Sequence, residues 1–171
     1  QALNADSATE LVAVGDIFQD ATVGVRRSMT RMFNKDGMPP RVTVSDDTAY
    51  SGFDNYLRVI EKSDVVLLAT TPHFRPQHLR AAIEAGKHVF CEKPVAVDAP
   101  GVRSVMESSE MAKAKGLALV SGLCWRYHPG KVATFEQIKN GAIGEIVSME
   151  CSYMYGGVWD PRRTRDKCDS E

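Results

Sequence analysis

The strongest constraint on the fold of this chain is a repeated alternation between short apolar runs and longer amphipathic segments. Apolar runs occupy residues 11–16, 65–69, 88–91 and 118–120. Continuous apolar runs of this length are typical of parallel strands that are buried on both faces. The segments that we interpret as helices are residues 20–33, 53–61, 76–85 and 100–115, and a further short strand is predicted at residues 42–44. The alternation predicts an α/β fold with a doubly wound parallel sheet.

The pattern changes after Gly122, where a second domain is predicted to begin. A helix is expected at residues 131–140, followed by one long alternating strand at residues 145–155. One face of that strand is much more apolar than the other, which is typical of an open antiparallel sheet. We therefore expect two domains, residues 1–122 and residues 123–171, and an open sheet in the second through which a homo-oligomer could form.

Composition is that of a soluble globular protein, with 43% hydrophobic residues, 25% charged residues and a formal net charge of -1. The chain has no basic block and no apolar run long enough to span a bilayer, so we expect neither nucleic acid nor a membrane as a partner. The cysteines are Cys91, Cys124, Cys151 and Cys168. Their spacing suggests neither a zinc site nor a disulfide framework, and free thiols fit a cytoplasmic location.

The segment that ends in Lys93 is the first candidate for a functional site. Residues 88–91 read as a buried strand, Gly86 closes the preceding helix, and Pro94 biases Lys93 away from helical geometry. A lysine at the carboxyl end of an interior strand lies where α/β sheets bind ligands, and Glu92 offers it a counter-charge. The alternative is a strand-end lysine that points into water, and these residues alone leave both readings open.

A resemblance to a known family rests on an ordered series of motifs. They are LATTP at 68–72, AAIEAGKHV at 81–89, EKP at 92–94, WRYHP at 125–129 and GAIGEI at 141–146. The series resembles the Gfo/Idh/MocA family of NAD(P)-dependent oxidoreductases, whose two-domain members are longer, so we expect this chain to be an internal fragment. The resemblance implies a partial dinucleotide-binding domain at 1–122 and the beginning of an α+β substrate-binding domain at 123–171.

The resemblance also implies which residues contact the cofactor. Thr70 and Pro72 would lie along its ribose and nicotinamide, with Glu92 and Lys93 near the reacting end. Arg126 would touch cofactor or substrate, although a domain-interface contact is an equal alternative. Arg75 takes the position at which the family usually has a histidine. His73 and His78 have structural roles in our interpretation, and no metal site is predicted.

Asp16 is the candidate for binding the adenosine ribose. An acid at the end of the strand after the phosphate loop can accept both ribose hydroxyls, which favours NAD over NADP unless Arg26 or Arg27 binds the 2'-phosphate. Strand-end aspartates also act as helix caps. The Gly-x-Gly-x-x-Gly turn that normally holds the pyrophosphate is not found before Glu10, so the sheet is expected to lack its first strand and glycine loop.

The resemblance implies hydride transfer between a sugar, inositol or related polyol and nicotinamide. Lys93 would stabilise charge on the substrate oxygen as an ammonium, or act as the base if burial lowers its pKa. An aspartate and a histidine that complete the family site would lie beyond Glu171. Two alternatives are a non-catalytic remnant or interaction module of the family, and an NAD-using glycosidase.

Overall fold

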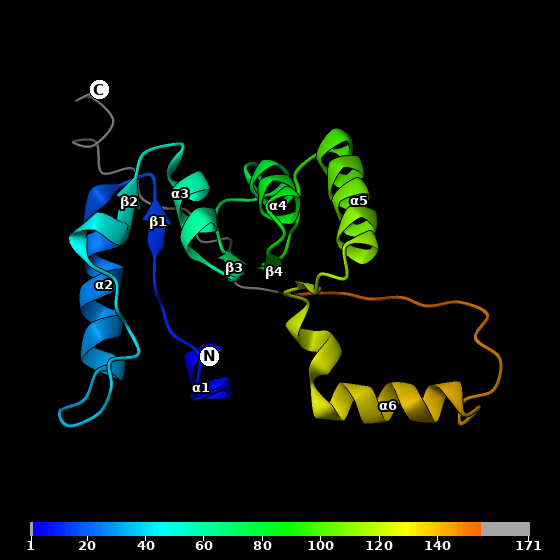
Figure 1. Cartoon of the computed structure of the whole chain (residues 1–171). Coiled ribbons are helices and arrows are strands. Elements are labelled where there is room, and N and C mark those ends of the chain that lie inside the picture. The colour runs from blue at the N-terminus through cyan, green and yellow to red at the C-terminus, as the bar shows by residue number, and fades with distance from the viewer. Residues whose placement is uncertain (1, 155–171) are drawn as a thin grey trace. The chain divides into compact units, whose positions relative to one another are not determined.

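The computed structural model describes residues 2–154, and the chain divides into two compact units between Trp125 and Arg126. The elements of the first unit are α1 (Ala2–Ala5), β1 (Val14–Asp16), α2 (Gln19–Phe33), the 3-10 turn Asp46–Thr48, β2 (Ala49–Ser51), α3 (Asn55–Lys62), β3 (Val65–Leu68), α4 (Arg75–Glu84), β4 (His88–Cys91), α5 (Ala99–Ala114) and β5 (Leu119–Ser121). Figure 1 shows these elements in chain order. Strands and helices alternate along this unit, as the sequence predicts.

The strands form two parallel sheets. β1 pairs with β2, while β4 lies between β3 and β5. In a doubly wound sheet, the first strand lies between the second and the fourth. β1 and β2 therefore take the places of the second and third strands, and β3, β4 and β5 those of the fourth to sixth. A cavity of about 670 Å³, lined by both β1 and β3, lies where the first strand would stand. The α/β class and the doubly wound sheet without its first strand are confirmed for the described residues.

The main core lies between β3, β4 and α4. Leu79 and Ile83 on α4 are fully buried, and they belong to one apolar cluster with Val66, Leu68 and Val89. Burial of each such side chain stabilises the fold by about 1.5–3 kcal/mol. α4 packs against both α3 and α5, so the three helices form a layer over one face of the sheets (Figure 1). This core fixes the ends of β3 and β4, where the predicted site residues lie.

The opposite face of β3 is exposed. Val65 and Leu67 are 55% and 54% exposed, whereas Val66 and Leu68 on the other face are buried. The apolar run predicts burial on both faces, and that expectation is wrong for β3. Among the described residues, the α3 to α5 layer covers only one side, so the run remains apolar on a face that water reaches.

The strand predicted at residues 42–44 is wrong. Val42 forms only an isolated bridge with Leu11, and the strand that pairs with β1 is β2 instead. The bridge to Leu11 uses the Arg41 carbonyl and the Thr43 amide, whereas the Val42 amide and carbonyl face the other way, toward the Asn34 side chain. Asn34 Oδ1 accepts a hydrogen bond from the Val42 amide, and Asn34 Nδ2 donates one to the Val42 carbonyl. Those backbone groups are therefore satisfied without a ladder.

The described part of the second unit contains α6 (Pro129–Lys139), which agrees with the predicted helix at 131–140. The predicted strand at 145–155 is wrong for residues 145–154, which have no regular secondary structure, and Tyr155 lies outside the described residues. Val147 and Met154 are 91% and 95% exposed. A strand needs a partner for its backbone groups, and residues 126–154 supply none. The sheet predicted as an oligomer interface is therefore not present in this part of the chain.

None of the helices that the structure describes is both long and apolar enough to cross a membrane.

Candidate functional site

The carboxyl end of β4 carries the turn that holds Lys93. Cys91 is buried at the end of the strand, Glu92 is half-buried, and Lys93 is exposed. The Lys93 amide donates a hydrogen bond of 3.1 Å to Glu92 Oε2, and the bond between Lys93 and Pro94 is cis. We call residues 92–94 the Lys93 turn.

The carboxyl end of β3, next to β4, carries a second turn, which we call the Thr70 turn and define as residues 70–74. Thr70 and Pro72 are half-buried, and the turn closes with a hydrogen bond of 3.1 Å from the Phe74 amide to the Thr71 carbonyl. The Thr70 hydroxyl lies 3.5 Å from His78 Nδ1. The parallel pairing of Leu68 with Cys91 brings the two turns to the same edge of the sheet.

Arg75 joins the two turns, a role that sequence reasoning missed. Its Nε donates a hydrogen bond of 2.7 Å to the Thr70 carbonyl, and its Nη1 donates hydrogen bonds to the carbonyls of Glu92 (2.9 Å) and Pro94. Its departure from the family pattern was visible in the sequence. A further signal was its place beside Pro76 in the first turn of a helix, where a cation is electrostatically unfavourable.

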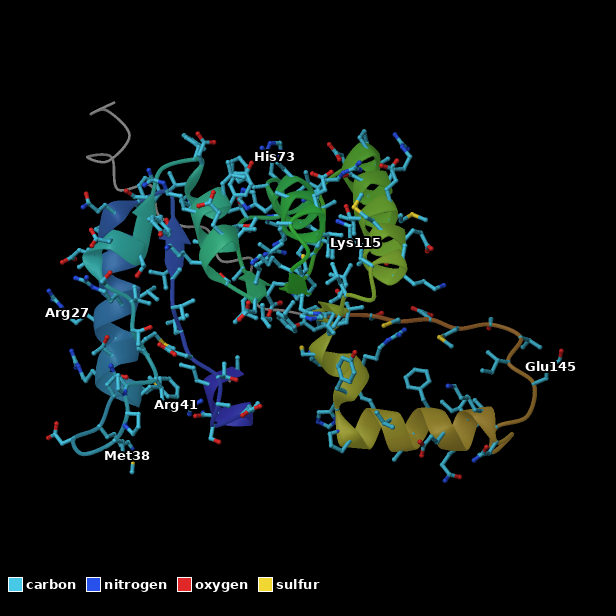
Figure 2. All side chains as sticks on the ribbon, viewed as in Figure 1. Arg27, Met38, Arg41, His73, Lys115 and Glu145 are labelled. Carbon is cyan, nitrogen blue, oxygen red and sulfur yellow. The ribbon has the colours of Figure 1, made fainter. Side chains whose placement is uncertain are left out.

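His78 supports the Thr70 turn from within α4. Its ring is buried and stacks on Tyr56 with a centroid distance of 4.1 Å. Burial lowers the pKa of His78, because a charged imidazole loses hydration there. His78 is therefore held in its neutral form as part of the packing. His73 is exposed and lies in the turn before α4 (Figure 2).

Glu92 also reaches the end of β5. A Cβ atom at Gly122 would lie 2.5 Å from Glu92 Oε2 and 3.1 Å from the Glu92 Cα, so a larger residue here would displace the Glu92 carboxylate. The Gly122 amide donates a hydrogen bond of 2.8 Å to the Cys91 carbonyl. Burial raises the pKa of the Cys91 thiol, and the nearby Arg75 cation opposes that shift. The thiol is thus a buried packing group and not a reactive one.

Asp16 lies at the exposed end of β1. Its Oδ1 accepts a hydrogen bond of 3.0 Å from the Phe18 amide, so the carboxylate holds the turn that precedes α2. Asp16 lines the same cavity as Thr70 and His78. A group that fills this cavity would thus meet both a strand-end carboxylate and the Thr70 turn.

The two arginines of α2 differ in what they contact. Arg26 Nη1 forms a salt bridge of 2.5 Å with Asp46. Arg27 is exposed and projects from the side of α2 that faces away from β1 (Figure 2).

Arg126 is exposed and lies in the 3-10 turn Cys124–Tyr127, at the start of the second unit. The structure therefore brings together Thr70, Pro72, Glu92 and Lys93, places Asp16 across the cavity, and leaves Arg126 unassigned relative to them. Within residues 2–154, no group of histidine, cysteine or carboxylate side chains could hold a metal ion.

The family model and the similar proteins all point to one family of oxidoreductases. Residues 3–123 match the family described as "Oxidoreductase family, NAD-binding Rossmann fold". An inositol 2-dehydrogenase of Pseudomonas syringae pv. syringae is 36% identical over 101 residues, which are 59% of this chain and 30% of that protein. An inositol 2-dehydrogenase/D-chiro-inositol 3-dehydrogenase of Shouchella clausii is 30% identical over 145 residues, which are 85% of this chain and 37% of that protein.

A solved structure shows the same fold. It is the Y186F mutant of KijD10, a 3-ketoreductase from Actinomadura kijaniata, in complex with TDP-benzene and NADP. The two chains superpose with a TM-score of 0.58 at 24% identity, over 85% of this chain and 38% of that one. The chain spans about a third of the length of the curated relatives named above.

Proposed function

The chain belongs to the oxidoreductase family with an NAD-binding Rossmann fold, and from this premise we propose that it supplies the cofactor-binding part of an NAD-dependent dehydrogenase. Its substrate class would be a sugar, inositol or related polyol, since the relatives at 30% and 36% identity are inositol dehydrogenases. The reaction removes a hydride from the carbinol carbon and a proton from its hydroxyl. The products are a ketone, NADH and a proton.

The observation that supports this proposal most is the meeting of the Thr70 turn and the Lys93 turn at one sheet edge. Ligands of open α/β sheets bind outside the carboxyl ends of the strands. The hydrogen bonds of Arg75 hold those two ends together, and the cavity lined by Thr70 also reaches Asp16. Residues of this chain could therefore meet a dinucleotide at two points, its adenosine ribose and its nicotinamide side.

In this proposal each residue has a separate task. Nicotinamide, when bound, supplies the acceptor for the hydride. Asp16 binds the ribose diol, while Thr70, Pro72, Glu92 and Arg126 contact the cofactor. Lys93, as an exposed ammonium at the end of β4, donates a hydrogen bond to the substrate oxygen and stabilises the negative charge that develops there. The base that takes the proton would be the histidine that the family resemblance implies further along the second domain.

The cofactor preference follows from the charges around Asp16. A carboxylate at the end of β1 would repel a 2'-phosphate, and the Arg26 guanidinium is engaged by Asp46 at 2.5 Å. We therefore propose NAD as the cofactor, although the KijD10 structure with the same fold was solved with NADP. The proposed location is the cytoplasm.

The test is a calorimetric titration with NADH of the 171-residue chain and of the protein expressed from its complete reading frame. We expect the complete protein to bind, because a glycine loop in the place of the cavity between β1 and β3 would hold the pyrophosphate. Binding by neither polypeptide would refute the proposed cofactor. It would support the second candidate, a non-catalytic member of the family.

A further inference from the structure

Arg75 is a buried cation in an electrostatically unfavourable place. It is 6% exposed, and it is the first residue of α4, where the helix dipole carries partial positive charge. A guanidinium stays protonated in proteins, so burial cannot neutralise it. Among the described residues, no carboxylate forms a salt bridge with it. Something other than helix stability must therefore account for an arginine at this position.

The hydrogen bonds of Arg75 supply that account. They reach carbonyls from two separate turns, since the Thr70 carbonyl belongs to the end of β3 and the carbonyls of Glu92 and Pro94 follow β4. The planar guanidinium presents donors in a fixed fork, so it can bond both turns only when they stand at one separation. Of the three carbonyls, those of Glu92 and Pro94 lie on either side of Lys93 in the chain.

We propose that Arg75 is a positioning residue that fixes the Lys93 turn against the Thr70 turn, and thereby sets where the Lys93 ammonium stands beside the cofactor. The part that concerns Lys93 rests on the proposed function. Because the Lys93 side chain is exposed, its location follows from its backbone. That backbone is held from Glu92 on one side and Pro94 on the other, both through the same Arg75 nitrogen.

The test is amide hydrogen exchange in the 171-residue chain, with Arg75→Met and Arg75→Lys as variants. The probes are the amides of Lys93 and Phe74, which donate to Glu92 Oε2 and to the Thr71 carbonyl. The reference is the Leu117 amide, which donates to the Ala112 carbonyl at 2.9 Å outside both turns. The ratio of the exchange rate at the two probe amides to the exchange rate at the Leu117 amide reports local opening of the turns.

We expect Arg75→Met to raise that ratio at least about tenfold, because carbonyls that were bonded to a cation lose their donor. Arg75→Lys keeps the charge but not the fork, so its ratio should lie in between. Arg80→Met is the matched control on the same helix. Arg80 pairs with Glu84 and Glu107 on the exposed side of α4, and its loss should leave the ratio within about twofold.

An unchanged ratio in Arg75→Met would overturn the proposal. If Arg75→Met does not fold, the exchange ratio of Arg75→Lys takes its place, and an unchanged ratio in that variant would overturn the proposal. Arg75→Ala with added millimolar methylguanidinium gives a further measurement, since the ion can replace the missing fork and should restore the slow exchange. Failure of this rescue in a folded variant would also count against the proposal.

A kinetic measurement separates positioning from simple stabilisation. In the protein from the complete reading frame, Arg75→Lys should lower kcat at least about tenfold while the KM for NAD changes less than about threefold. Equal loss in kcat and in the folded fraction would mean that Arg75 only stabilises the fold. If the wild-type protein neither binds NADH nor turns over polyol, the proposed function fails, and the exchange ratio still decides whether Arg75 fixes the two turns.

Discussion

Replacement of Lys93 by alanine should separate catalysis from folding and from cofactor binding. The Lys93 side chain is exposed, and the hydrogen bond described for this residue is made by its backbone amide, which alanine keeps. Unfolding free energy should therefore change by less than about 0.5 kcal/mol. The ammonium would act on the substrate oxygen as charge develops, and loss of one such donor costs about 2.7–4 kcal/mol of transition-state stabilisation. The expected loss in kcat is about 100-fold to 1000-fold.

The assay is NADH formation from inositol by the protein expressed from its complete reading frame, with NAD affinity measured by calorimetry. Lys113→Ala is the matched control, since Lys113 is an exposed lysine in the last turn of α5, away from the ends of β3 and β4. We expect the control to keep its kcat, and the affinity of Lys93→Ala for NAD to stay within about threefold of the wild type. A kcat of Lys93→Ala within a factor of two of the wild type would show that the Lys93 ammonium does not stabilise the transition state.

Asp16→Ala should weaken binding of NAD more than binding of NADP, because only the ribose diol loses its acceptor; equal losses in two calorimetric titrations would contradict the ribose assignment. Leu79→Ala should lower the unfolding free energy by about 2–5 kcal/mol in urea denaturation, because Leu79 is 0% exposed and its loss leaves a cavity in the main core. The pKa of His78 is lowered in the folded state, so the unfolded chain binds more protons and stability should fall as pH drops below about 6.5. The urea midpoint at pH 7.5 and pH 5.5 measures this loss, and a His78→Gln variant with the same pH dependence would show that another group causes it.

The sequence predicts the elements whose ends carry strong local signals. β4 has the predicted bounds, His88–Cys91, since an apolar run stands between Gly86, whose φ is 76°, and the Lys93 turn. Only Val14–Asp16 of the strand predicted at 11–16 forms β1, and β2 was missed because its three residues, Ala49–Ser51, are polar enough to resemble a turn. Its place is set by pairing with β1, a tertiary contact that local composition does not record.

The site could be predicted only in part, for a related reason. Thr70 and Lys93 each follow an apolar run, and neighbouring parallel strands bring their carboxyl ends to one edge. Arg75 reaches carbonyls 5, 17 and 19 residues away in the chain. No periodicity reports a side chain that binds backbone carbonyls at such separations, so its link between the two turns is visible only once the strands are paired.

If this chain carries the cofactor side of a polyol dehydrogenase, a hydride from the polyol should be recovered on the nicotinamide. Inositol deuterated at its ring carbons is incubated with NAD and the protein expressed from its complete reading frame, and the nicotinamide is analysed by mass spectrometry. We expect one deuterium on the reduced nicotinamide and an equal amount of ketone. Nicotinamide that stays oxidised and unlabelled with inositol and with a panel of other polyols and sugars, while NADH still binds, would contradict the proposed function.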